Sequence, residues 1–192
     1  MIGHMALHII RHGKPASTWG GGDDDPGLDE TGQAQARAVA QRLLALPPEE
    51  RPRAVVSSPL RRCRETAQPL ADALGVEVEI DPAVGEIPTP AGLAAAERPA
   101  WLRKAFEGAW GEIRGDLDYD LWRRRVAEAV TARTDTAVFS HFVAINALVS
   151  VLTGAEAVIS FRPDHTSVTT LKTEDGAVRL ARLGEEAVTG VL

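Results

Sequence analysis

Short apolar runs alternate with longer stretches of helical periodicity along most of the chain, a pattern typical of an α/β layered fold. The expected strands lie at 7–10, 54–56, 76–80, 136–139, 168–171 and 178–183. The expected helices lie at 29–45, 58–74, 119–133 and 142–152. Because strands and helices alternate, we predict a three-layer α/β/α sandwich around a mostly parallel sheet.

Particular residue types set some of the expected helix ends. At the second helix, Ser58 is placed to cap the N-terminus, and Pro59 would occupy the first helical position, where a missing N–H costs nothing. Gly75 and Gly154 are expected to close the second and the last helix, because glycine adopts the left-handed conformation that ends many helices.

The stretch from 88 to 115 is irregular and interrupts this alternation. Trp101, Phe106 and Trp110 fall there at helix-like spacing, and we interpret the two tryptophans as core residues rather than as substrate platforms. We expect a small helical insertion that covers the site. With 192 residues and no repeat or linker, the chain is expected to form a single domain over 1–192.

Composition and charge argue against several classes of protein. Apolar residues make up 44% and charged residues 25% of the chain, close to the average of globular proteins, and the net charge is −6. The chain lacks the basic footprint of nucleic-acid binding, so we expect no nucleic-acid partner. It also lacks a secretory signal and any run of about 18 apolar residues, so we expect a cytoplasmic protein without membrane association.

Polar residues follow three of the expected strands at the point where each strand ends. These are Arg11-His12-Gly13, then Ser57-Ser58 with Arg61 and Arg62 shortly after, and Ser140-His141. In open α/β sheets the carboxyl ends of the strands form the crevice where ligands bind. If these strands are neighbours, histidines and arginines meet there, and Arg presents a rigid fork that suits phosphate oxygens. The pattern predicts phosphate recognition but does not choose between the two arginines.

Other polar residues are given a structural interpretation. His8 alternates along a strand and His165 lies in a turn rich in Pro and Asp, so neither is assigned a functional role. Cys63, the only cysteine of the sequence, excludes an internal disulfide and is interpreted as a small buried helix residue. Three consecutive side chains rarely converge on one ion, so Asp23-Asp24-Asp25 does not predict a metal site.

Five elements of a known pattern occur along the chain in order. Arg11-His12-Gly13 follows the first strand, and Leu28–Gly32 occupies the place of a Leu-Thr-x-x-Gly helix opening. Ser57–Ala67 matches a Ser-Ser-Pro-Leu-x-Arg-Ala-x-x-Thr-Ala block except for a Cys at the Ala position. Glu86 and a strand ending in His141 complete the series. Together these elements resemble the histidine phosphatase superfamily, which includes the cofactor-dependent phosphoglycerate mutases, and the resemblance covers essentially the whole chain.

The resemblance implies a role for each matched residue. His12 would be the nucleophile and Glu86 the proton donor, with no metal and no cofactor. The expected phosphate ligands are Arg11, Arg62, His141 and, in the place of a phosphate-contacting Asn of the family, Thr18. Because the functional arginine of the motif directly precedes the Ala position, the resemblance selects Arg62 over Arg61.

The expected chemistry is an attack by a neutral His12 ring on the phosphorus of a phosphate ester, which forms a phosphohistidine. The other ring nitrogen of His12 should donate to a backbone carbonyl, for example that of Gly13, which fixes the tautomer. His141 would serve best in its protonated form, which a bound phosphate favours.

Hydrolysis of a small phosphorylated substrate is the expected function. The chain has no room for the longer insertions of the phosphoglycerate mutases, which favours hydrolysis over mutase activity. The alternatives are a mutase-type phosphotransferase, a phosphoprotein phosphatase and a non-catalytic phosphate-binding module. Two further departures from the family pattern, Lys14-Pro15 after the first motif and Phe142 after His141, concern the choice of substrate.

Overall fold

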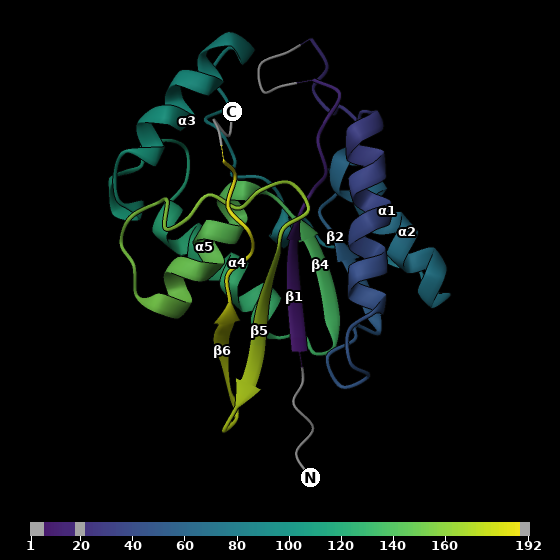
Figure 1. The fold of residues 1–192 in the computed structure, drawn as a ribbon. Helices are drawn as coiled ribbons and strands as arrows, with labels where there is room; N and C mark the ends of the chain where they lie inside the picture. The colour runs from purple at the N-terminus through teal and green to yellow at the C-terminus, as the bar shows by residue number, and fades with distance from the viewer. Residues whose placement is uncertain (1–5, 18–21, 189–192) are drawn as a thin grey trace.

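A computed structural model describes residues 6–17 and 22–188 of the chain, which form one layered unit around a six-stranded sheet (Figure 1). The strands are β1 (Ala6–Arg11), β2 (Ala54–Ser57), β3 (Val78–Ile80), β4 (Thr136–Ser140), β5 (Val168–Glu174) and β6 (Ala177–Arg182). Their order in the sheet is β3-β2-β4-β1-β5-β6. The four strands from β3 to β1 are parallel, whereas β5 and β6 are antiparallel additions. The mostly parallel sheet is therefore confirmed.

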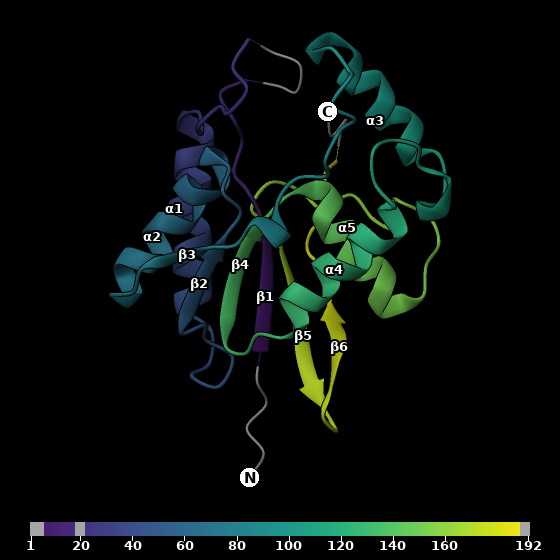
Figure 2. The same cartoon turned by 180° about the vertical axis from the view of Figure 1, so that it is seen from behind.

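Helices cover both faces of this sheet. They are α1 (Glu30–Leu44), α2 (Arg61–Leu74), α3 (Arg98–Phe106), α4 (Tyr119–Thr131) and α5 (Phe142–Thr153). Figures 1 and 2 show α1 and α2 on one face and α4 and α5 on the other, which confirms the three layers. Both views also show α3 beyond the carboxyl ends of β1 and β4.

Alternation along the central strand explains why the sheet is buried on both sides. In β1, Leu7 and Ile9 belong to the core under α4 and α5, whereas Ile10 belongs to the core under α1 and α2. Successive side chains of a strand point to opposite faces, so an apolar run of this length needs a helical layer on each face. The residues that follow β1 therefore emerge at the edge of the sheet, between the two helical layers.

The expected start of the second helix is wrong. Helix α2 begins at Arg61, three residues after the predicted cap, and Leu60 at its N-cap makes no side-chain hydrogen bond. The Arg61 N–H instead donates to Asp25 Oδ1 at 2.8 Å, so a carboxylate distant in sequence caps this helix. The predicted C-terminal glycines are confirmed, since Gly75 and Gly154 both end their helices with positive φ.

The predicted insertion contains α3 and two short 3₁₀ turns. Trp110 is buried, with its ring centroid 6.0 Å from that of Trp122, and Trp101 lies 5.6 Å from Tyr119. Trp110 is therefore a core residue, as predicted, whereas Trp101 packs against the same core while partly buried. None of the helices in the described ranges is long and apolar enough to cross a membrane.

Candidate active site

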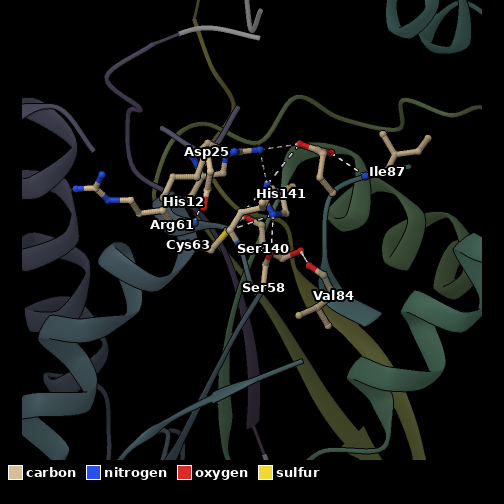
Figure 3. A network of polar contacts seen from close by, with 12 residues as sticks. His12, Asp25, Ser58, Arg61, Cys63, Val84, Ile87, Ser140 and His141 are labelled. Atoms are coloured by element: carbon tan, nitrogen blue, oxygen red, sulfur yellow. Dashed lines mark hydrogen bonds and ion pairs between the residues drawn. The ribbon is translucent and has the colours of Figure 1, made fainter. Parts of the chain in front are cut away.

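The order of the strands brings the predicted polar residues to one edge of the sheet. Arg11 at the end of β1 pairs in register with Ser140 at the end of β4, and Ser57 of β2 pairs with Phe139 of β4. The residues that follow these strand ends therefore emerge side by side. Figure 3 shows the resulting network, with His12 and His141 together above the sheet.

His12 is held as a neutral ring with a defined tautomer. Its Nδ1 lies 2.8 Å from Gly13 O, and because a carbonyl oxygen only accepts, Nδ1 carries the proton. This is the contact expected from the sequence. The opposite nitrogen, Nε2, accepts from Arg62 Nε at 3.3 Å. Burial, helped by the nearby charge of Arg62, lowers the pKa of His12 well below its ordinary value, so Nε2 carries no proton at neutral pH.

The loop that carries His12 is fixed by close backbone packing. The Gly13 N–H donates to Thr66 Oγ1 at 2.9 Å, which ties the loop to α2. A Cβ on Gly13 would clash with the carbonyl oxygen of Gly32, and a Cβ on Gly32 would clash with that of Lys14. Two glycines facing each other therefore allow the loop to lie against the first turn of α1. Lys14 itself is exposed and pairs with Asp29 at 3.0 Å.

Arg62, and not its neighbour, lies in the site. Its side chain is buried, and Nη2 lies 3.3 Å from His141 Nδ1 and 3.4 Å from Glu86 Oε2. Arg61 is exposed and forms an ion pair with Glu65 on the surface of α2. The structure therefore resolves a choice that helical spacing alone left open.

Arg11 is the second buried guanidinium of the site. Its Nη1 donates to Pro163 O at 2.9 Å, and its Cζ lies 5.3 Å from the centre of the Phe142 ring. Burial lowers the pKa of Arg11 to about 10, so the group stays charged at neutral pH. The buried Nε has no hydrogen-bond partner among the described residues. Phe142, a departure from the family pattern, thus forms an aromatic wall beside this cation.

His141 lies between the arginine and the sheet. Its Nε2 is 2.8 Å from Ser58 Oγ and its Nδ1 is 3.4 Å from Glu86 Oε2. Burial, together with the charges of Arg62 and Arg11, lowers the pKa of His141 well below its ordinary value. His141 is therefore neutral in the protein without bound phosphate. We expect a phosphate dianion to raise this pKa, because an opposite charge favours the charged form.

Glu86 completes the cluster from the segment that follows β3. Its Oε1 accepts from the N–H of Ile87 at 3.0 Å, while Oε2 faces Arg62 and His141. Burial raises the pKa of Glu86 above its ordinary value, although the positive charge of Arg62 opposes this shift. A carboxyl group in this environment holds a proton more firmly than an exposed one, which suits a general acid.

Predictions from the sequence also concern Thr18 and Cys63. Thr18, an expected phosphate ligand, lies outside the described residues. Cys63 is buried on α2 as predicted, and its Sγ is 3.4 Å from His141 Nε2. Burial raises the pKa of its thiol, so it is an inert thiol at neutral pH.

His165 is the residue that the sequence interpretation missed. Its Nδ1 lies 3.1 Å from His12 O, and the two rings are 5.6 Å apart between centroids. It lies in an irregular segment before β5, where no periodicity indicates a direction for the side chain, and only its residue type could have marked it. Burial, with the charge of Arg11, lowers the pKa of His165 to about 4.

The charged or ionisable side chains of the site, apart from the histidines, are the guanidinium groups of Arg11 and Arg62 and the carboxyl group of Glu86. In the ranges 6–17 and 22–188, no three His, Cys, Asp or Glu side chains are grouped so that they could hold a metal ion. Arg11 and Arg62 are the two buried guanidinium groups at this end of the sheet. Two guanidinium groups beside a neutral imidazole can hold a phosphoryl group and present a nucleophile to it.

Comparison with known proteins agrees with this arrangement. The histidine phosphatase superfamily (branch 1) matches residues 7–186. A probable phosphoglycerate mutase GpmB of Erwinia tasmaniensis is 28% identical over 171 residues, which cover 80% of this chain and 77% of that protein. The structure of a mycobacterial glucosyl-3-phosphoglycerate phosphatase is 25% identical, with a TM-score of 0.72 over 96% of this chain and 100% of that one.

A phosphoserine phosphatase of Entamoeba histolytica shares the fold, with a TM-score of 0.73 at 22% identity over 94% of this chain and 96% of that one. The similar proteins thus include both phosphatases and mutases by name. Because the family match spans nearly the whole chain, and its motifs meet at one edge of the sheet, this protein belongs to the histidine phosphatase superfamily.

Proposed function

We propose that the protein is a phosphomonoester hydrolase that works through a phosphohistidine on His12 and needs no metal ion. The observation that carries the proposal is the state of His12, a neutral ring whose Nδ1–H is bound to Gly13 O and whose Nε2 faces Arg62. A neutral nitrogen held at a guanidinium group is prepared to attack a phosphorus atom that the same guanidinium attracts.

In the first step, the lone pair of His12 Nε2 forms a bond to phosphorus while the bond from phosphorus to the ester oxygen breaks. The equatorial oxygens lie against Arg11, Arg62 and His141, which stabilise the charge of the transition state. Glu86 gives its carboxyl proton to the departing oxygen, so the alcohol leaves neutral.

In the second step, water attacks the phosphorus of the phosphohistidine. The Glu86 carboxylate, left by the first step, accepts a proton from this water, and the bond between Nε2 and phosphorus breaks. The products are inorganic phosphate and a His12 ring that again carries its proton on Nδ1 alone. One acid–base group therefore serves both half-reactions.

A mutase-type transfer is the second candidate, because the name of the GpmB relative from Erwinia tasmaniensis favours it. The 25% identity to a solved phosphatase, with complete coverage of that chain, favours hydrolysis. A purely phosphate-binding module or a phosphoprotein phosphatase has less support. A module that only binds phosphate would not need a buried carboxyl group with a raised pKa, as Glu86 has. A phosphoprotein substrate would have to approach past the small insertion with α3, which lies over this end of the sheet.

The test is release of phosphate from a generic aryl phosphate in the presence of a chelator, comparing the wild type with His12→Ala. We expect steady turnover by the wild type and none by the variant. Turnover that needs an added metal ion, or that survives His12→Ala, would contradict the proposal. Incubation with phosphoglycerates, followed by product analysis, distinguishes hydrolysis from phosphoryl transfer between hydroxyl groups.

A further inference from the structure

The segment 163–167, just before β5, is folded against the backbone of the nucleophile. Thr166 N–H donates to Arg11 O at 3.0 Å, and Pro163 O accepts from the Arg11 side chain at 2.9 Å. His165 Nδ1 lies 3.1 Å from His12 O. The Arg11 N–H also donates to Ser167 O at 3.4 Å, so four contacts from five consecutive residues converge on Arg11 and His12. The proposed function assigns phosphate binding to Arg11 and the nucleophilic attack to His12.

This segment is itself held in an unusual backbone conformation. Thr166 has a φ of +56°, in the left-handed region that a β-branched residue rarely adopts. Its carbonyl accepts from Arg42 of α1 at 2.7 Å, and the Ser167 N–H donates to Asp164 O at 3.1 Å. Strained backbone of this kind persists where the surroundings over-determine it, and it occurs often at functional sites.

The ring of His165 has a tautomer set by its contact. Because His12 O only accepts, His165 Nδ1 must carry the proton and donate it. The His12 ring therefore lies between two others, with the centroid of His141 at 5.3 Å and that of His165 at 5.6 Å. The Nε2 of His165 has no hydrogen-bond partner among the described residues, so its Nδ1–H is the group that ties this ring to the protein.

His12 is thereby held on three sides. Its backbone N–H donates to Ser140 O at 3.0 Å, its carbonyl accepts from His165, and its ring donates to Gly13 O. Without the His165 contact, the carbonyl end of the His12 backbone would lose its side-chain anchor. The direction of the Nε2 lone pair would then be less sharply defined, and in-line attack depends on that direction.

We propose that His165 is a positioning residue for phosphoryl transfer, whose Nδ1–H fixes the backbone and hence the ring of His12 in the attacking orientation. The proposal rests on the proposed role of His12 as nucleophile and adds a third histidine to the site. It assigns no bond to phosphorus and no proton transfer to His165. A merely structural residue at this position would affect stability but not the chemical step once the protein is folded.

The test compares His165→Ala, His165→Asn and, as a control at the position directly before the segment, a variant of the exposed Arg162, Arg162→Ala. The Nδ2 of Asn, like the Nδ1 of His, is an N–H donor bonded to Cγ, so Asn can restore the contact with His12 O. We expect His165→Ala to lower kcat on the order of 10- to 100-fold, with the inhibition constant of inorganic phosphate unchanged. His165→Asn should recover most of kcat, and Arg162→Ala should match the wild type.

Equal kcat in the wild type and His165→Ala would overturn the proposal, as would an Asn variant no better than the Ala variant. A parallel measurement does not depend on turnover. In ¹⁵N NMR of histidine-labelled protein, the His12 ring nitrogens should give sharp signals in the wild type and His165→Asn, and signals broadened by exchange between ring orientations in His165→Ala. An unchanged His12 signal in the folded Ala variant would contradict positioning even if the protein proved not to be a hydrolase.

Discussion

Two neighbouring arginines show how the environment of a single residue decides its chemistry. Arg61 and Arg62 begin the same helix, yet the first is exposed on the surface and the second is buried against His12, His141 and Glu86. A buried guanidinium interacts with a bound anion in a region of low dielectric, whereas an exposed one is screened by water. The pair is therefore an internal comparison for the phosphate site.

We expect Arg62→Ala to lower kcat/KM for an aryl phosphate on the order of 10²–10³-fold, the range for loss of one donor to transition-state charge. Arg61→Ala, one residue earlier on α2, should leave kcat/KM close to that of the wild type. Steady-state kinetics of the two purified variants measure this difference. Similar losses in both variants would mean that the site does not depend on the buried arginine specifically.

Glu86 determines the alkaline side of the expected pH profile. The active form needs His12 neutral and Glu86 protonated, so kcat/KM should rise as pH increases through the lowered pKa of His12. It should fall again as pH increases through the pKa of Glu86, which burial raises above its ordinary value. Glu86→Gln should reduce the rate on the order of 10²–10⁴-fold and remove the alkaline fall. An alkaline fall that persists in Glu86→Gln would assign it to another group.

At the scale of elements, the loop after β1 and the first turn of α1 meet through backbone rather than side chains. Gly32 lies so close to Lys14 that a Cβ would strike its carbonyl oxygen. In an ordinary exposed helix, replacing Gly by Ala stabilises by up to about 1 kcal/mol. Here the steric conflict opposes that gain, because the conflicting atom is backbone and belongs to the loop that carries His12.

Gly32→Ala should therefore destabilise the protein by roughly 1–3 kcal/mol, the range of overpacking, and lower activity as the loop shifts. Gln33→Ala, at the next and exposed position of α1, should change the free energy of unfolding by less than about 0.5 kcal/mol. Urea denaturation of both variants gives the two values. If Gly32→Ala were more stable than the wild type, the loop that carries His12 would be able to move away from the added Cβ without loss of stability.

The elements that could be predicted from the sequence are those whose signals are local. Apolar runs identify β1 and β4, and Gly75 and Gly154 mark helix ends by their own backbone preference. The start of α2 could not be predicted in this way, because Asp25, 36 residues earlier, supplies its cap. Long-range caps of this kind leave no trace in helical periodicity.

The same limit applies to the site. Arg11, His12, Arg62, Glu86 and His141 can be identified because they follow strand ends or stand in a known motif. His165 could not, since its contact with His12 depends on how an irregular segment folds across 153 residues of sequence separation. The neutral state of His141 also requires the structure, because burial and two arginine charges determine it.

At the scale of the whole molecule, the fold buries several histidines in neutral form. His8, His12, His141 and His165 all have lowered pKa values, chiefly because of burial. In the unfolded chain these groups take up protons near their ordinary pKa of 6.5, so below that pH the unfolded state binds more protons than the folded state. Stability should therefore fall as pH decreases through this range. Glu86, with a raised pKa, acts in the opposite sense but is a single group.

We expect the melting temperature to fall between about pH 7.5 and pH 5 in a buffer without phosphate, since several buried histidines outweigh one carboxyl group. Differential scanning calorimetry in matched buffers measures the trend. Added inorganic phosphate should raise the melting temperature at each pH, because it binds the folded state alone. A melting temperature that rises steadily towards pH 5 without phosphate would contradict the neutral burial of these histidines.

In the proposed mechanism His12 carries the phosphoryl group between the two half-reactions, so the decisive measurement is to trap the phosphorylated enzyme. The enzyme would be mixed with an aryl phosphate, quenched within one turnover, and digested at neutral to alkaline pH for mass spectrometry. We expect one added phosphoryl group on the peptide that contains His12, stable in base and lost in acid, and none in His12→Ala. Turnover without a phosphorylated His12 peptide, or with the phosphoryl group on another residue, would contradict this mechanism.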